Sequence, residues 1–256
     1  MHQAYLPWKK NMDTERIAIV GGSGLTWLDT LTVEKQKVVV TPYGDPSAPL
    51  TFGQFGKLPV VFLPRHGAGH TIPPHEVNYR ANIWALHSVG VKKIISVASV
   101  GGITMEPGIL CVPDQIIDYT WGREHTYVEP GQSPVKHVDF TEPYCEELRQ
   151  ALIRAGMNAS VRLKKDGCYG ATQGPRLETA AEIQRMHRDG CDLVGMTGMP
   201  EAALARELGL CFAHLSLVVN WAAGLGKGPI TMQEIQANLD QSIEAVKQLL
   251  TTMEAD

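Results

Sequence analysis

Five short apolar runs recur along the 256-residue chain, and they constrain its fold more than any other feature. Each run is rich in aliphatic side chains and is bounded by glycine, proline or asparagine nearby. Such runs are typical of strands that are buried on both faces of a sheet. We therefore expect strands at residues 17–20, 60–63, 93–99, 192–196 and 213–220.

Helical patterns lie between several of these runs. Apolar residues at near-helical spacing mark residues 75–90, 177–190 and 200–209, and each segment ends at a glycine, which is a common helix stop. A last amphipathic segment starts at Thr231 and places its apolar residues on one stripe. The alternation of strands and helices predicts an α/β fold with a central sheet.

Composition and charge exclude several classes of function. The net charge is -4 and no basic run is present, which argues against a nucleic-acid partner. No apolar run approaches the length that a membrane-spanning helix needs. Residues 1–16 are polar and lack the apolar core of a signal peptide. We expect a polar extension there, followed by a single domain over residues 17–256.

The cysteines are scattered along the chain and odd in number. They are Cys111, Cys145, Cys168, Cys191 and Cys211. Because they include no C-x-x-C pair, we predict neither a disulfide framework nor a zinc cluster. Cysteines in apolar settings are usually core residues, so we expect a protein of the reducing cytoplasm.

Small and polar residues gather where the predicted strands end. The glycine-rich turn in "IAIVGGSGL" offers backbone amides and the Ser23 hydroxyl to an anion. Arg65 and His66 follow the second run, and both can donate hydrogen bonds to phosphate. Ser99 and Thr197 stand at the ends of two further runs, the edge at which α/β sheets bind ligands. Taken one by one, these features are also explained by turns, caps and surface residues, and the histidines lack standard zinc spacing.

Two further polar residues allow two interpretations each. Asn220 ends the apolar run in "SLVVN", where an asparagine is most simply a turn residue. Glu178, in "ATQGPRLET", stands where a helix should begin, and a carboxylate there favours the helix dipole. Both residues could instead face a ligand.

Four motifs, in this order along the chain, resemble the trimeric purine nucleoside phosphorylases and within them the methylthioadenosine phosphorylases. They are "IAIVGGSGL", "PRHGAGHTIPPHEVNYRANIWAL", "GPRLET" and "GMTGMPEAALARELGL", and the likeness runs from Ile17 to about Leu250. The resemblance implies a single α/β domain with a mixed, barrel-like sheet flanked by helices. It also implies a homotrimer that cleaves a purine nucleoside with inorganic phosphate. Neither a metal nor an organic cofactor is implied, because phosphate is itself the nucleophile.

The same resemblance implies roles for particular residues. Phosphate would be bound by Ser23, Arg65, His66, Ala98, Ser99 and Thr197. Met196 would cover the ribose, and His137 would reach into the site of a neighbouring subunit. Asn220 and Glu178 would hold the base and, with His66, take part in catalysis.

The base end of the site departs from the methylthioadenosine branch. That branch carries two aspartates where this chain has Asn220 and Ala222. The pair of Asn220 with Glu178 instead resembles members that cleave inosine and guanosine. An asparagine can donate to a 6-oxo group, whereas a carboxylate only accepts. The sequence therefore predicts a 6-oxopurine base.

The sugar end resembles the methylthio branch. Inosine-cleaving members place a histidine where this chain has Met232, with Ile235 one turn further on. An apolar wall suits a thioether better than a hydroxyl. The combination resembles the S-methyl-5′-thioinosine phosphorylases. The alternatives are a methylthioadenosine phosphorylase with a relaxed base site, an inosine and guanosine phosphorylase, and a nucleoside-binding protein without catalysis.

Overall fold

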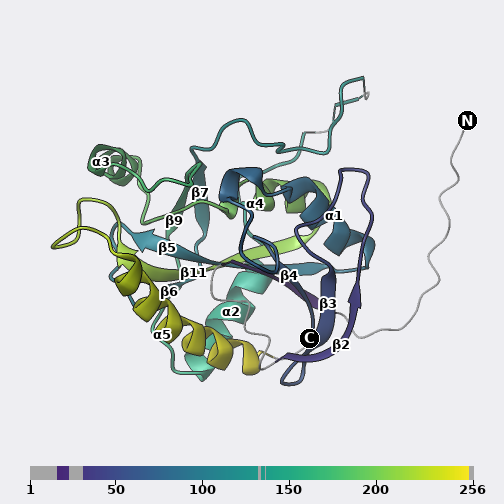
Figure 1. Ribbon diagram of the computed structural model, residues 1–256, viewed down its shortest axis with the longest axis horizontal. Coiled ribbons are helices and arrows are strands. Elements are labelled where there is room, and N and C mark those ends of the chain that lie inside the picture. Colours follow the sequence, from purple (N-terminus) through teal and green to yellow (C-terminus); the bar gives the residue numbers. More distant parts are fainter. Residues whose placement is uncertain (1–15, 23–30, 132–133, 136, 254–256) are drawn as a thin grey trace, which may run out of the picture.

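The structure is a computed structural model, and it describes residues 16–22, 31–131, 134–135 and 137–253. Figure 1 shows the arrangement of its elements. The strands are β1 (Ile17–Gly21), β2 (Leu31–Lys37), β3 (Leu50–Phe55), β4 (Leu58–Pro64), β5 (Lys93–Gly102), β6 (Leu110–Cys111), β7 (Gln115–Asp118), β8 (Leu163–Lys164), β9 (Cys168–Ala171), β10 (Leu193–Gly195) and β11 (Cys211–Trp221). The helices are η2 (Pro74–Glu76), α1 (Tyr79–Ser88), α2 (Glu146–Asn158), α3 (Ala180–Arg188), α4 (Gly198–Glu207) and α5 (Met232–Thr251).

The strands form one mixed sheet in which β5 is the junction. β5 runs parallel to β1 on one edge and parallel to β11 on the other. Where β1 ends, β10 pairs with β5 in the antiparallel direction through Gly101 and Gly102. Strands β9 and β7 continue from β10, and β4, β3 and β2 continue from β1. The predicted α/β class and mixed sheet are confirmed.

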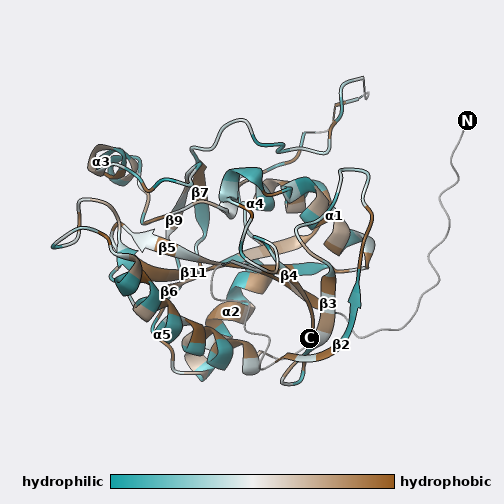
Figure 2. Ribbon diagram, viewed as in Figure 1, coloured by the Kyte–Doolittle hydropathy of each residue, from teal (hydrophilic) through white to brown (hydrophobic). Residues whose placement is uncertain are grey.

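The sheet is covered on both faces, because its central strands alternate their apolar side chains between two cores. In β1, Ile17 and Ile19 face the core formed with α2 and α5. Ala18 and Val20 face the core formed with α1 and α4. The two pairs of helices lie on opposite sides of the sheet in Figure 1. Figure 2 shows hydrophobic residues along the central strands and alternating character along α5.

Capping hydrogen bonds from side chains mark the residues at which the predicted helices begin. The Asn78 side chain accepts a hydrogen bond from the Ala81 amide, so α1 begins several residues after the start of the predicted segment. Thr179 and Glu182 form a capping box at α3. Thr231 caps α5, as expected for a helix that starts at this point.

The prediction about the cysteines is wrong in one respect. Cys145, the N-cap residue of α2, forms a disulfide with Cys211, the first residue of β11. The two residues are 66 positions apart, so their spacing gives no signal of the pairing. Cys111 and Cys191 are buried, as expected for core cysteines.

The structure bears on the membrane prediction, and it leaves the predicted domain bounds untested. Within the described ranges no helix is long and apolar enough to span a membrane. The division between an extension at residues 1–16 and a domain at 17–256 stays a prediction, because residues 1–15 lie outside the described ranges.

Candidate active site

A cavity of about 500 Å³ lies where β4, β5, β10 and β11 end. The segment between β9 and α3 and the first turns of α5 complete its wall. The predicted site residues that line it are Arg65, His66, Ala98, Ser99, Glu178, Met196, Thr197, Asn220, Ala222 and Met232. Residues predicted from six separate stretches of sequence therefore meet around one space.

Two predicted site residues are not part of this wall. Ser23 lies outside the described residues, so its role stays a prediction. His137 lies in the long segment between β7 and α2, where it is exposed, and it does not line the cavity of its own chain.

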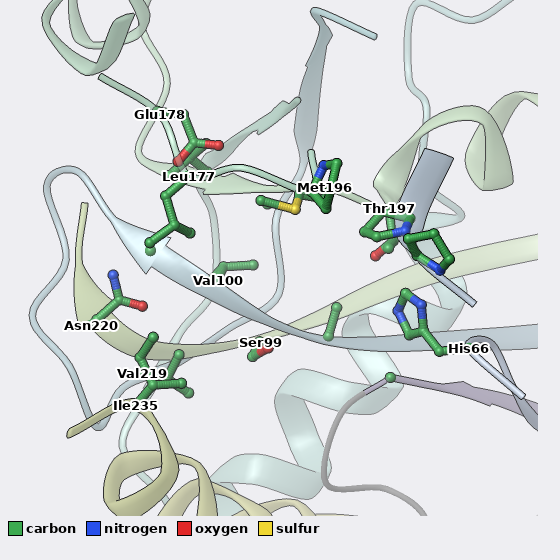
Figure 3. A pocket seen from close by; sticks show the side chains of 18 of the residues that line it. His66, Ser99, Val100, Leu177, Glu178, Met196, Thr197, Val219, Asn220 and Ile235 are labelled. Atoms are coloured by element: carbon green, nitrogen blue, oxygen red, sulfur yellow. The ribbon is translucent and has the colours of Figure 1, made fainter. Parts of the chain in front are cut away.

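The cavity has two ends, which Figure 3 shows. Thr197 and His66 lie at one end, which we call the Thr197 end. Glu178 and Asn220 lie at the other, which we call the Asn220 end. Met196 lies between them, as a residue over a sugar should.

Arg65 is fully buried beneath the Thr197 end, and most of its guanidinium is already engaged. Nε and Nη2 donate to the two carboxylate oxygens of Glu201 at 2.5 and 3.1 Å. Nη2 also donates to the Ser96 hydroxyl at 2.8 Å, and Nη1 donates to the Val97 carbonyl at 3.1 Å. The forked edge expected to grip phosphate is thus taken by Glu201. An anion in the cavity would meet the second Nη1 hydrogen and the positive charge.

Gly22 lies next to Arg65 Nη1. A Cβ at Gly22 would lie 3.1 Å from Arg65 Nη1, which is closer than ordinary van der Waals contact. A side chain at this position would therefore push the Arg65 guanidinium by a few tenths of an ångström.

His66 offers the cavity a hydrogen-bond acceptor, whereas its sequence context suggests a donor. Its Nδ1 lies 2.8 Å from the Ile72 carbonyl, and because a carbonyl only accepts, Nδ1 carries the proton. Burial and the nearby Arg65 charge lower the pKa of His66 to about 4. The ring is therefore neutral at pH 7, and its Nε2 is a hydrogen-bond acceptor rather than the donor that we expected.

Thr197 has an unpaired polar group. It is the N-cap residue of α4, but its side chain makes no capping bond. Its hydroxyl is buried and has no hydrogen-bond partner among the described residues. Buried polar groups are nearly always paired, so an unpaired hydroxyl in a cavity wall points to a ligand.

Asn220 lies inside β11, at an irregularity in its pairing with β5, and not in a turn. Its Nδ2 donates to the Trp221 carbonyl at 2.7 Å, which leaves one amide hydrogen and Oδ1 for other partners. Figure 3 shows Oδ1 on the side that faces Met196 and Ser99. The turn interpretation of this residue is therefore wrong.

Glu178 precedes α3 and does not cap it, because the capping carboxylate is Glu182. One Glu178 oxygen, Oε1, instead accepts from the Thr172 hydroxyl at 2.7 Å. Thr172 is buried behind it. This bond fixes one Glu178 oxygen and leaves the other for a donor in the cavity.

Apolar side chains close the cavity between Asn220 and α5. Val219, Ile230, Met232 and Ile235 line this part. Met232 is 75% exposed, so it stands at the mouth of the cavity rather than at its base. The Asn238 side chain donates to the Val219 carbonyl at 2.7 Å and ties α5 to the strand that carries Asn220.

Sequence reasoning missed the residues that support the wall. Glu201 acts on Arg65 through a contact between distant segments, and Thr172 acts on Glu178 within the segment between β9 and α3. A carboxylate within the apolar stretch "MPEAALA" was the only sequence signal for Glu201. Among the described residues, no cluster of three or more histidine, cysteine or acidic side chains could hold a metal ion.

Comparison with known proteins gives the family. A model described as the phosphorylase superfamily matches residues 16–254. The chain belongs to the phosphorylase superfamily. It is 52% identical over 237 residues to a protein of Xanthomonas campestris pv. campestris named "Probable S-methyl-5'-thioinosine phosphorylase", covering 91% of this chain and 95% of that protein. It is 46% identical to the "6-oxopurine nucleoside phosphorylase" of Pyrococcus furiosus, over 92% of this chain and 90% of that protein.

A solved structure supports the same grouping. The methylthioadenosine phosphorylase from Schistosoma mansoni in complex with adenine matches with a TM-score of 0.88 and 33% identity, covering 93% of this chain and 90% of that one. These relatives and structural neighbours are nucleoside phosphorylases, which are pentosyltransferases that use phosphate as co-substrate. The predicted family and enzyme class are confirmed.

Proposed function

We propose that the chain catalyses the phosphorolysis of S-methyl-5′-thioinosine to hypoxanthine and 5-methylthioribose 1-phosphate. The observation that carries the proposal is the Asn220 end of the cavity, where Asn220 and Glu178 meet and Ala222 lines the same wall. Relatives at about half identity bear this activity in their names, which supports the assignment.

Phosphate would lie at the Thr197 end. The unpaired Thr197 hydroxyl and the remaining Nη1 hydrogen of Arg65 are its donors. Ala98 and Ser99 line the cavity beside them, along β5. These groups would hold one phosphate oxygen under the anomeric carbon, and positioning of this kind supplies much of the rate.

The base would leave from the Asn220 end. The glycosidic C–N bond breaks with its electron pair passing to the purine, while a phosphate oxygen forms the new bond to the anomeric carbon. Asn220 would hold the 6-oxo group through Nδ2 and a proton at N7 through Oδ1. Glu178, fixed by Thr172, would accept from N1–H. Both contacts would favour the charge that develops on the purine as it departs.

The 5′ substituent would meet the apolar side chains at the start of α5. Val219, Ile230 and Ile235 offer no hydrogen-bond partner to a 5′-hydroxyl, whereas a methylthio group gains from burial against them. This contact favours the methylthio nucleoside over inosine.

Three finer features belong to the same proposal. We propose a homotrimer in which His137, exposed on its own chain, completes a neighbouring site beside the exposed Met232. We propose that the enzyme works in the cytoplasm. We also propose that it needs no cofactor, because inorganic phosphate supplies the nucleophile.

A panel of four nucleosides tests the assignment. The purified protein is incubated with inosine, adenosine, and the 5′-methylthio form of each, with and without phosphate, and the free base is measured. We expect phosphate-dependent hypoxanthine release from methylthioinosine to be fastest. A preference for methylthioadenosine would instead identify a methylthioadenosine phosphorylase, and a preference for inosine would identify an ordinary 6-oxopurine phosphorylase. Binding without base release would identify a nucleoside-binding protein.

A further inference from the structure

Arg123 is a buried cation with no acidic partner among the described residues. It lies in the segment after β7, its residue is 8% exposed, and it does not line the cavity. None of the ion pairs formed by the described residues includes it. A buried charge without a counter-ion is costly unless its hydrogen bonds are all made, so its partners indicate what it is for.

Those partners are backbone carbonyls of the two segments that form one wall of the cavity. Nη1 donates to the carbonyls of Met196 and Met199, at 2.8 and 2.6 Å. These residues flank Thr197 at the start of α4. Nη2 donates to the carbonyls of Thr172 and Gln173, at 3.2 and 2.9 Å.

Each of these segments carries one end of the site. Thr172 and Gln173 follow β9, and the Thr172 hydroxyl holds Glu178 at the Asn220 end. Met196 follows β10 and leads into Thr197 at the other end. Strands β7, β9 and β10 are parallel neighbours, so Arg123 joins the segments that leave three adjacent strands.

Arg123 also contacts a third part of the cavity wall, through Tyr79. Nη1 of Arg123 lies 3.2 Å from the Tyr79 hydroxyl, which donates to the Pro74 carbonyl at 2.7 Å. Pro74 lines the cavity next to the His66 segment. The guanidinium also lies over the Tyr79 ring, 5.2 Å from its centroid. No neutral side chain offers five donors in one plane to such a set of acceptors.

We propose that Arg123 is a positioning residue that fixes the base-binding and phosphate-binding halves of the site relative to each other. It acts through Thr172 on Glu178 and through Met196 on Thr197, and it touches neither substrate. This inference rests on the proposed function for the identity of the two ligands.

Arg149 provides a control that matches Arg123 in burial and in its bonds to backbone carbonyls, although it also pairs with Glu146. It is also buried, and it donates to the backbone carbonyls of Pro113 and Lys165 at 2.9 and 2.6 Å. It does not line the cavity, and its partners lie away from the segments that do. Substitution at either arginine leaves buried carbonyls without donors, so both should lower thermal stability.

The experiment compares Arg123→Met and Arg123→Lys with Arg149→Met and Arg149→Lys. For each folded variant we would measure kcat, both Michaelis constants, and hypoxanthine binding by calorimetry with and without phosphate. We expect kcat/KM of Arg123→Met to fall about a hundredfold, because a small misplacement of both halves is enough to cause such a loss. Both Michaelis constants should rise, and phosphate should no longer strengthen hypoxanthine binding. Arg123→Lys should recover part of each effect, and the Arg149 variants should match the wild type.

The outcomes separate the proposals. Arg123 variants that lose thermal stability but keep the kinetics and binding of the Arg149 variants would overturn the positioning role. If Arg123→Met does not fold, Arg123→Lys decides the question by the same measurements. A wild-type protein that releases no base from any nucleoside would instead overturn the proposed function. In that case, stabilisation by inorganic phosphate alone that is weakened in Arg123→Lys and kept in Arg149→Lys would still support the positioning role, and full retention in both would refute it.

Discussion

Glu201 accepts two hydrogen bonds from Arg65, and neither side chain has any exposed surface. The pair lies directly beneath the Thr197 end of the cavity, 136 residues apart in the sequence. It holds the guanidinium flat against the ends of the strands, so the charge is fixed in place before a ligand arrives. Several expected outcomes follow from this arrangement and from the groups around it.

Replacing Glu201 with glutamine should leave Arg65 as a buried charge without its counter-ion. We expect the free energy of unfolding to fall by about 3 kcal/mol or more, as for other buried pairs that lose one partner. Urea unfolding measures this. The control is Glu147→Gln, which breaks the surface pair with Lys93. That change should barely alter stability, and an equally small effect at Glu201 would show that Arg65 does not depend on it.

His66 should let the site distinguish phosphate from sulfate. Its neutral ring offers an acceptor at Nε2, and phosphate at neutral pH keeps a proton to donate whereas sulfate has none. We expect sulfate to compete with phosphate at least about tenfold less tightly, for one mismatched bond. In His66→Gln, the side-chain amide can also donate a hydrogen bond. The difference in affinity between phosphate and sulfate should therefore be smaller in this variant. Inhibition constants at pH 7.5 give the answer, and equal affinity in the wild type would contradict the acceptor role.

His214 should make the protein sensitive to acid. It is fully buried, its Nδ1 lies 3.0 Å from the Ser216 hydroxyl, and its Nε2 has no partner among the described residues. Burial and the Arg65 charge lower its pKa to about 3. As the pH falls from about 6.5 toward 3, the unfolded chain binds a proton at this site that the native state does not. Stability should therefore drop by up to about 1.4 kcal/mol per pH unit in this window.

The test is the pH dependence of unfolding in His214→Met. Its slope between pH 6 and about 4 should be flatter than that of the wild type. The exposed His187, changed to glutamine, is the control and should keep the wild-type slope. Parallel curves for the wild type and His214→Met would show that His214 takes up no proton on unfolding.

Asn220→Asp should change the preferred base. The new carboxylate would face both the Trp221 carbonyl and the 6-oxo group with no proton to offer. Activity on methylthioinosine should fall about tenfold or more, which corresponds to roughly 1.4 kcal/mol. Activity on methylthioadenosine should hold or rise, and Ala222→Asp added to it should strengthen the shift. The ratio of the two specificity constants is the measurement, and an unmoved ratio would remove Asn220 from base recognition.

Met232→His should change the preferred sugar. The residue stands at the cavity mouth at the start of α5, where a histidine could meet a 5′-hydroxyl. Use of inosine should improve and use of methylthioinosine should weaken, since an apolar contact is exchanged for a hydrogen-bonding one. The measurement is the specificity constant for each of the two nucleosides, in the wild type and in the variant. An unchanged preference would assign the 5′ pocket to Ile230 and Ile235 instead.

The sequence predicted the buried strands that form continuous aliphatic runs. β2 was missed since all of its residues after Leu31 are exposed. β3, β7 and β9 were missed because polar residues, glycine or cysteine interrupt their aliphatic residues. Helix α2 was missed as well: Cys145, its N-cap residue, makes no side-chain capping bond, so no capping signal marks its start.

For the site, sequence motifs located the residues that face the cavity but not those that hold them. Arg123 bonds to segments 50 and 73 residues away. Such contacts follow from the pairing of strands, which no local pattern records. The pairing of Arg65 with Glu201 was missed for the same reason, because Glu201 comes from a distant helix.

The junction at β5 has a consequence for how the cavity comes into being. β5 borders β1, β10 and β11, which come from widely separated parts of the chain. Pairings between distant segments form slowly compared with local ones. A chain emerging from the ribosome cannot form the Asn220 end until β11, whose last residue is Trp221, is free to lie along β5. Catalytic activity should therefore report on completed folding, with no partial activity from chains cut before that strand.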